Sequence, residues 1–223
     1  MVDFSFGDEV RAPDGRGGRA VGEDSHAYQE QLLRQMSAED PRPFVMGGFG
    51  EDAVLHHRST RPHSDIDWFT TRDQLDRSSE IAGRLGLPTM GVYGRTATGD
   101  PFYVAWTKDE SFWLECVVAD RGADGALYIE LAELNFDTTG LPPLAPFRIQ
   151  LPPDTVSYPP SPFEDFEVQT VSPLALYQIR TGLNRFETFG PLRDKDILAA
   201  QQLRERFFPD ATDHELAPRI ELL

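Results

Sequence analysis

Cysteine and lysine are both scarce in this sequence of 223 residues, which has one cysteine, Cys116, and two lysines, Lys108 and Lys195. A single cysteine excludes an intramolecular disulfide and a zinc site built from cysteines. No apolar run approaches the roughly 18 residues that a membrane-spanning helix needs. The first residues carry neither a basic region nor a long apolar stretch, so no signal peptide is predicted. These absences favour a cytoplasmic protein without a membrane partner.

Two familiar site patterns are also missing. No Gly-Lys-Ser/Thr sequence follows Gly47-Gly48, which argues against a P-loop ATPase. His56, His57 and His63 lie near a pair of aspartates, but their spacing matches no recognised zinc pattern. We therefore expect neither a Walker-type phosphate loop nor a zinc centre.

Basic residues are few relative to acidic ones, 21 against 37, and the formal net charge is −16. Such a surface repels nucleic acid and anionic membranes and favours a cationic small-molecule partner. No basic stripe follows the chain, so a nucleic-acid partner is not expected. Composition leaves the oligomeric state open.

The most informative stretch covers residues 44–69. Its apolar start, 44–46, predicts a buried strand that ends at Gly47-Gly48. Residues without a Cβ let the backbone turn tightly there and approach a ligand closely. A helix is expected over 49–57, followed by a short strand over 65–69.

Asp65 and Asp67 lie two residues apart on that second strand. Side chains alternate between the faces of a strand, so both carboxylates share one face while Ile66 and Trp68 point into the core. Neighbouring carboxylates repel each other unless a cation lies between them. Mg²⁺ takes oxygen ligands of this kind, usually with substrate phosphates completing its shell. The pattern predicts a site for one or two Mg²⁺ ions.

This stretch resembles the signature of the nucleotidyltransferase superfamily, and in particular the aminoglycoside and lincosamide nucleotidyltransferases. In that branch Gly-Gly-Trp-Ala-x-Asp precedes Thr-Arg-x-His-x-Asp-Ile-Asp, and residues 47–52 and 60–67 match these two segments. Phe49 replaces the Trp and Gly50 replaces the Ala, and neither change removes a catalytic group. The resemblance implies an α+β fold, with a mixed polymerase beta-like sheet flanked by helices and a C-terminal helical lobe.

Glu115 is the one carboxylate within the apolar segment 112–118. A charge in a buried strand is costly unless it is paired or bound to a metal. The resemblance implies a third catalytic carboxylate on a later strand, where the aminoglycoside branch has Asp followed by Cys and this chain has Glu115 followed by Cys116. Glu115 is then a metal ligand, the general base, or both. The alternative is a pair with an arginine on an exposed sheet face.

Candidate nucleotide-binding residues follow from the same resemblance: Gly47, Gly48, Arg61, Ser64 and Lys195. The relatives have an Arg-x-Lys-Asp segment whose lysine reaches the triphosphate, and residues 193–196 match it. An ammonium group beside a helix N-terminus binds anions well, although a capping charge cluster on a solvated turn is the alternative. Arg61 either touches a phosphate or braces its loop by pairing with Asp52.

The remaining chain divides by composition. Residues 1–23 form a predicted flexible arm, and 24–150 a catalytic domain with helices over 24–36 and 71–85. Strands over 89–94, 101–107, 111–119 and 126–131 are separated by short turns, as in an antiparallel meander. Prolines crowd 141–165, so 151–171 is a predicted connection, with 147–151 and 166–171 as pieces of a loop or edge hairpin. Helices from Pro173, over 192–208 and from Thr212 would form the C-terminal lobe, 172–223.

These features together predict transfer of a nucleoside monophosphate, with ATP as the expected NTP donor, to a hydroxyl of a small molecule. Asp65, Asp67 and Glu115 would hold Mg²⁺, and pyrophosphate would leave. The acidic surface favours an aminoglycoside-like antibiotic as acceptor, and a lincosamide-like antibiotic or another hydroxylated metabolite would fit the same motif. The alternative is an antitoxin-type nucleotidyltransferase that modifies or binds a protein partner.

Overall fold

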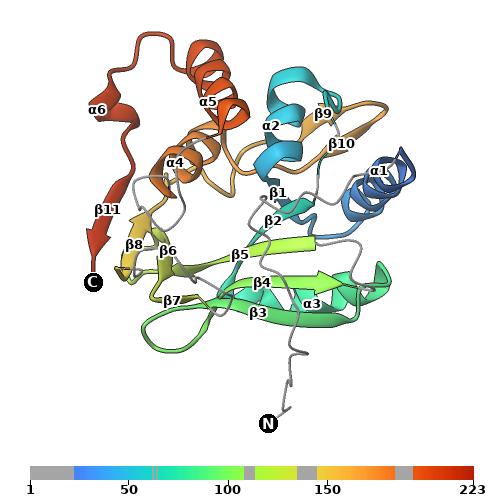
Figure 1. Cartoon of the computed structure of the whole chain (residues 1–223), viewed down its shortest axis with the longest axis horizontal. Coiled ribbons are helices and arrows are strands. Elements are labelled where there is room, and N and C mark those ends of the chain that lie inside the picture. Colours follow the sequence, from blue (N-terminus) through green and yellow to red (C-terminus); the bar gives the residue numbers. More distant parts are fainter. Residues whose placement is uncertain (1–22, 62, 64, 108–113, 135–144, 184–192) are drawn as a thin grey trace.

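The computed structural model describes residues 23–61, 63, 65–107, 114–134, 145–183 and 193–223. In this part of the chain a curled, nine-stranded mixed sheet carries helices against both faces (Figure 1). Its strands are β1 Phe44–Met46, β2 Ile66–Thr71, β3 Thr89–Arg95, β4 Pro101–Thr107, β5 Leu114–Arg121, β6 Leu127–Leu131, β7 Glu133–Leu134, β8 Phe147–Gln150 and β11 Arg219–Leu222.

Helices connect and cover these strands. They are α1 Glu23–Ser37, α2 Gly47–His56, α3 Leu75–Arg84, which follows the 3-10 turn η1 Arg72–Gln74, α4 Pro173–Leu183, α5 Asp194–Phe207 and α6 Asp213–Leu216. A separate hairpin, β9 Ser161–Phe163 with β10 Phe166–Val168, lies beside α1. The predicted α+β class is therefore confirmed.

Most strands run in the order β11-β8-β6-β5-β4-β3-β7, and β2 pairs with β5 outside this path. The β2–β5 pairing is parallel, whereas β1 pairs with β2 in the antiparallel sense. The predicted meander of β3, β4, β5 and β6 is antiparallel throughout. The parallel crossover from β2 to β5 brings two distant polar segments of the sequence to one place in the sheet.

One core lies where α1 and α3 pack against the sheet. Trp68 of β2 and Trp106 of β4 meet there, with ring centroids 5.5 Å apart. Leu114 and Cys116 of β5 are fully buried in the same cluster. The alternation of β5 therefore turns Leu114 and Cys116 inward to this core and Glu115 to the opposite face.

A second core forms where α4 and α5 meet the other part of the sheet. Its aliphatic and aromatic side chains include Phe69, Ile129 and Ile149 from the strands and Leu176 and Leu203 from the helices. Ser172 caps α4 as predicted, because its Oγ accepts from the backbone N–H of Ala175 at 3.3 Å. The C-terminal helices are thus fixed to the sheet by apolar packing.

The proline-rich segment was interpreted wrongly in one respect. β8 is not a loop or an edge strand, because it lies between β6 and β11 with Ile149 opposite both Ile129 and Ile220. Pro146 and Pro152 stand just outside the strand, so the ladder keeps its N–H donors. The pairing strand β11 was not predicted at all.

Residues 1–22, which include nearly all of the predicted arm, lie outside the described residues, and the division into domains stays a prediction. No helix in the described ranges is long and apolar enough to cross a membrane.

Candidate active site

Two of the predicted carboxylates are neighbours across the parallel strands. In the β2–β5 ladder Asp67 lies directly opposite Glu115. Asp65 precedes β2 by one residue, so it shares the face of Asp67, while Ile66 and Trp68 are buried in the core. The structure therefore brings Asp65, Asp67 and Glu115 together, although 48 residues separate Asp67 from Glu115 in the chain.

The three carboxylates repel one another. Burial, followed by the charge of Asp65, raises the pKa of Asp67 to about 7. Burial, followed by the charges of Asp65 and Asp67, raises the pKa of Glu115 well above its ordinary value. Ionising all three groups at once therefore needs a compensating cation.

Glu115 is 6% exposed, and its two carboxylate oxygens have different surroundings. Oε2 accepts a hydrogen bond from the hydroxyl of Tyr103. Oε1 is buried and has no hydrogen-bond partner among the residues that the structure describes. Glu115 therefore does not pair with an arginine on an exposed face, and its buried Oε1 fits a ligand or a cation. In the described part of the chain, however, no three His, Cys, Asp or Glu side chains stand ready-grouped to hold a metal ion.

Tyr103 contacts the candidate site through Glu115, and sequence reasoning missed it. On β4 the small residue Ala105 lies opposite Glu115, and Tyr103, two residues earlier, reaches across diagonally on the same face. Tyr93 packs edge-on against Tyr103, with ring centroids 6.1 Å apart. Burial and the neighbouring Glu115 raise the pKa of Tyr103 well above 10 and that of Tyr93 to about 12. Tyr103 consequently remains a neutral hydrogen-bond donor.

The Gly47-Gly48 turn lies directly against the carboxylates. Met46 pairs with Asp67 across β1 and β2, which places Gly47 over the aspartate side chain. Gly47 has φ +58°, and a Cβ at this position would lie 1.7 Å from Asp67 Oδ2. A Cβ on Gly48 would lie 2.3 Å from His63 Nδ1. Both positions therefore require glycine, and α2 begins at the carboxylate cluster.

His63 and Asp52 brace the loop that follows α2. His63 Nε2 donates to Asp52 Oδ2 at 2.9 Å, and the backbone N–H and hydroxyl of Thr60 donate to the same carboxylate at 2.9 and 2.7 Å. The ring of Phe49 packs on His63 at 4.1 Å, and burial lowers the pKa of the imidazole. His63 is thus a structural residue of the loop.

Arg61 belongs to this loop as well. Its Nη2 would lie 3.1 Å from a Cβ on Gly48, so the guanidinium stands beside the glycine turn. Both predicted roles, a phosphate contact and a brace, stay predictions. Ser64 lies outside the described residues.

Lys195 lies in the first turn of α5, close enough to the cluster to interact with it. Burial, followed by the charges of Arg193 and Arg61, lowers the pKa of Lys195, while Asp196 and Asp65 act in the opposite direction. Its ammonium in turn lowers the pKa of Asp67. Lys195 therefore lies within electrostatic reach of Asp65 and Asp67, and its predicted contact with the triphosphate stays a prediction.

A chain of ion pairs was not predicted. Arg180 of α4 binds Glu51 of α2 and Asp196 of α5. Its charge also lowers the pKa of Asp67. The sequence did contain one signal for this chain of ion pairs, because Arg180 is a basic residue among the regularly spaced apolar residues of α4.

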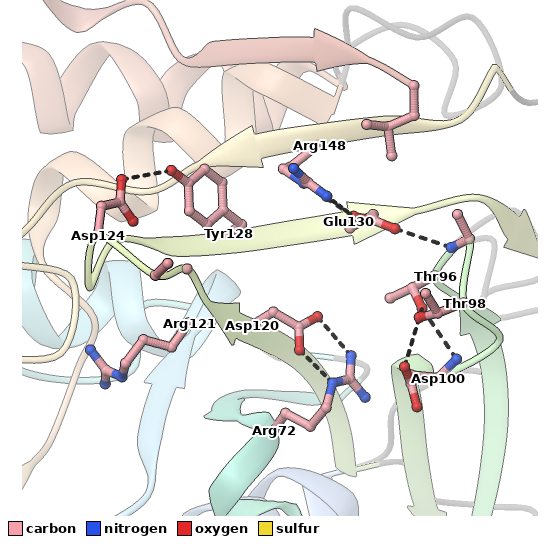
Figure 2. Close-up of a pocket in the computed structure, with 14 residues that line it drawn as sticks. Arg72, Thr96, Thr98, Asp100, Asp120, Arg121, Asp124, Tyr128, Glu130 and Arg148 are labelled. Carbon is pink, nitrogen blue, oxygen red and sulfur yellow. Dashed lines mark hydrogen bonds and ion pairs between the residues drawn. The ribbon is translucent and has the colours of Figure 1, made fainter.

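A hollow of about 770 Å³ lies elsewhere, at the far end of β5 (Figure 2). None of the predicted site residues that the structure describes lines it. Its charged groups are already engaged: Arg72 with Asp120, and Arg148 with Glu130. Asp120 stands five residues beyond Glu115, roughly 16 Å along an extended strand. This hollow is therefore separate from the carboxylate cluster.

No protein-family model and no curated protein sequence matches the chain significantly. Solved structures do match. The solution structure of the antibiotic-resistance factor ANT(2'')-Ia is 18% identical in sequence to this chain. The match covers 83% of this chain and 87% of ANT(2'')-Ia, with a TM-score of 0.53. The crystal structure of ANT(2'')-Ia with adenylyl-2''-tobramycin is 18% identical over 84% and 92%, with a TM-score of 0.50. The lincomycin-bound lincosamide antibiotic adenylyltransferase LnuA is 16% identical over 82% and 96%, with a TM-score of 0.49.

At these identities the similarity to ANT(2'')-Ia shows the fold. The predicted nucleotidyltransferase fold is thereby confirmed. The roles of the individual site residues stay predictions.

Gly47→Ala tests the close approach of α2 to Asp67. The new Cβ would displace the Asp67 carboxylate and strain the backbone, so we expect a cost of about 1–3 kcal/mol in the free energy of unfolding. Nucleotidyl transfer should fall on the order of 100-fold, because the carboxylate is misplaced. Urea unfolding and initial rates measure the two effects.

Two glycines of α3 and its end serve as controls. Gly83 has open space around it inside the helix, so Gly83→Ala should stabilise by about 0.5–1 kcal/mol. Gly86 has φ +81°, and a Cβ added there would meet no described atom within 4 Å, so Gly86→Ala should show strain without loss of activity. Full activity of Gly47→Ala would contradict the placement of Asp67.

Asp67→Asn tests the repulsion itself, in metal-free protein with EDTA. The folded-state pKa of Asp67, about 7, exceeds its ordinary value of 3.8, so wild-type stability is lost as pH rises between these values. At pH 8 the variant should be more stable by on the order of 1–2 kcal/mol. The gain should shrink towards pH 4. Thermal unfolding across this range measures it, with the exposed Asp76→Asn as control, and a variant less stable at pH 8 would refute the repulsion.

Proposed function

We propose that the protein is a nucleotidyltransferase that moves a nucleoside monophosphate, expected to be AMP, from an NTP to a hydroxyl of a small molecule. The observation that carries the proposal is the placement of Asp67 beside Glu115 and under the Gly47 turn, within the nucleotidyltransferase fold. An NTP donor is an intracellular metabolite, so the proposal includes a cytoplasmic enzyme.

The acceptor class follows from charge and from the relatives. One solved relative, ANT(2'')-Ia, was crystallised with adenylyl-2''-tobramycin. The net charge of −16 favours a cationic acceptor of this kind. An aminoglycoside-like antibiotic is therefore the first choice, and a lincosamide-like antibiotic the second.

Asp65, Asp67 and Glu115 would hold one or two Mg²⁺ ions. The buried Glu115 Oε1 without a hydrogen-bond partner and the mutual repulsion of the carboxylates support this assignment. A bound Mg²⁺ stabilises negative charge on the attacking and leaving oxygens of phosphoryl transfer.

The chain's own cations and amides would bind the triphosphate. The backbone N–H groups of Gly47 and Gly48 open α2, and a helix N-terminus attracts phosphate. Lys195 supplies an ammonium on the opposite helix, where it would offset charge on the departing pyrophosphate. Arg61 and Ser64 would complete the phosphate contacts from the loop after α2.

Glu115 would act as general base. Tyr103 holds Oε2, which leaves Oε1 either to bind Mg²⁺ or, where Asp65 and Asp67 hold the metal without it, to take the acceptor proton as the hydroxyl attacks the α-phosphate. The hydrogen bond fixes the carboxylate rotamer and thereby the direction of Oε1. Tyr103 makes this hydrogen bond as a neutral donor.

The product of the reaction tests the function directly. Purified protein would be incubated with Mg²⁺, each NTP, and a panel of aminoglycosides, lincosamides and candidate proteins, and intact masses would be measured. We expect an antibiotic to gain one nucleotide mass with release of pyrophosphate. EDTA should abolish transfer, and Asp67→Ala should reduce it on the order of 1,000-fold because metal binding is lost.

The exposed Asp76→Ala is the matched control and should keep full activity. Transfer to a protein alone would replace the small-molecule proposal with the antitoxin-type alternative. Absence of any transfer, in folded protein with every NTP, would refute both.

Tyr103→Phe tests the orientation of the base. The variant keeps the ring packing but leaves Glu115 Oε2 without its donor, so kcat should fall by about 10- to 100-fold. KM for the NTP should change less than about two-fold, since the base does not bind phosphate. Steady-state kinetics separate the two parameters.

Tyr128→Phe is the matched control, because it also removes a tyrosine–carboxylate hydrogen bond, to Asp124 at 3.1 Å, but far from the site. Its kcat should equal that of wild type. Equal kcat values for Tyr103→Phe and wild type would remove Tyr103 from the mechanism.

A further inference from the structure

A branched ion-pair chain joins three helices beside the carboxylate cluster. Arg180 of α4 donates from Nε to Glu51 Oε1 at 2.8 Å, and its Nη2 donates to the same oxygen. Its Nη1 donates to Asp196 Oδ1 at 2.8 Å. Glu51 is 4% exposed and Asp196 is 6% exposed, so both carboxylates are withdrawn from water. One guanidinium therefore bridges α2 to α5.

Each end of the bridge lies close to a proposed phosphate-binding group. Glu51 is one helical turn after Gly47, in the helix that opens against Asp67. Asp196 directly follows Lys195 in the first turn of α5. Arg193 closes this turn by donating from Nε to Asp196 Oδ2 at 2.6 Å. Arg180 thus links the helix that begins at the glycine turn to the helix whose first turn carries Lys195.

Stability alone is a weak explanation for this bridge. Buried ion pairs often contribute no more than well-packed apolar side chains of the same volume, because desolvating the charges is costly. What an arginine adds is a planar fork that binds two partners at fixed angles. Glu51 and Arg180 are 129 residues apart in the chain. The guanidinium therefore fixes a distance between helices that contacts between neighbouring residues in the sequence cannot fix.

The charge of Arg180 also acts on the catalytic cluster. It lowers the pKa of Asp67, and Asp67 in turn raises the pKa of Arg180. This interaction places the guanidinium within electrostatic reach of the proposed metal ligand, which is consistent with a role at the site.

We propose that Arg180 is a positioning residue that holds Lys195 and the Gly47-Gly48 turn at the separation needed to bind the triphosphate of the donor. The inference rests on the proposed function, since it assigns an NTP to this site. Arg180 touches neither the phosphate nor the acceptor in this scheme and acts through Asp196 on its neighbour Lys195.

A double-mutant cycle tests whether Arg180 acts through Lys195. The variants are Arg180→Lys, Lys195→Ala and the double variant, and the probe is a non-hydrolysable ATP analogue with Mg²⁺, titrated calorimetrically. Arg180→Lys keeps the charge but cannot bridge both carboxylates, so we expect about 10-fold weaker binding. Lys195→Ala should also weaken binding by about 10-fold. The double variant should bind within about two-fold of Lys195→Ala, because the two losses are not additive when Arg180 acts through Lys195.

Arg148→Lys is the matched control for the substitution. Arg148 also binds a largely buried glutamate, Glu130, from Nη2 at 2.6 Å and from Nε at 3.0 Å, on the far part of the sheet. We expect it to lower the unfolding temperature without changing the dissociation constant. A structural role of Arg180 would give this same result.

A second variant covers the case in which Arg180→Lys does not fold. Asp196→Asn keeps the shape of the side chain but weakens the link to α5, and it should show the same non-additivity with Lys195→Ala. Additive losses, or unchanged affinity in the folded Arg180 or Asp196 variant, would overturn the inference. If wild-type protein bound no NTP analogue, the proposed function would fail instead.

Discussion

The parallel pairing of β2 with β5 is the constraint on which the site depends, because it sets Asp67 opposite Glu115 with Asp65 two residues away. The arrangement is unfavourable by itself, since burial and repulsion raise the pKa of both Asp67 and Glu115. Surrounding groups offset this cost in part: Tyr103 donates to one oxygen of Glu115, and Arg180 and Lys195 act on Asp67 as cations. A bound cation would relieve the repulsion that remains. The carboxylate cluster therefore lowers the stability of the metal-free protein and raises its affinity for a cation.

Packing explains why the sheet tolerates this cluster. Leu114 and Cys116 alternate with Glu115 and are fully buried in the core that contains Trp68 and Trp106, so apolar burial on one face fixes the strand that carries the charge on the other. A one-residue slip of β5 would bury Glu115 in this core and expose its apolar neighbours. The register of Asp67 and Glu115 is therefore determined by the hydrophobic pattern of the strand and not by the carboxylates themselves.

Features encoded within a few residues were predictable, and those encoded across the fold were not. The glycine pair, the two aspartates and a lone glutamate in an apolar strand each leave a local signal, and the similarity of fold agrees with the interpretation of that motif. Arg180 left a weak signal because its partners come from two other helices, 129 and 16 residues away. β8 was misinterpreted because proline frequency was averaged over a segment, whereas the ladder depends only on whether a proline falls inside the strand.

Phe49 and Gly50 differ from the residues of the family that the chain resembles, and both fit the contacts that join α2 to distant parts of the chain. Phe49 packs on the ring of His63 at 4.1 Å, which holds the loop that carries Arg61. A Cβ on Gly50 would lie 3.0 Å from the carbonyl oxygen of Val45 and 3.3 Å from Leu176 Cδ2. An alanine there would require Val45 or Leu176 to shift by a few tenths of an ångström, and the Glu51–Arg180 contact lies one residue further along α2. Glycine at position 50 thus allows α2 to pack closely on β1 and α4, one residue before the Arg180 bridge.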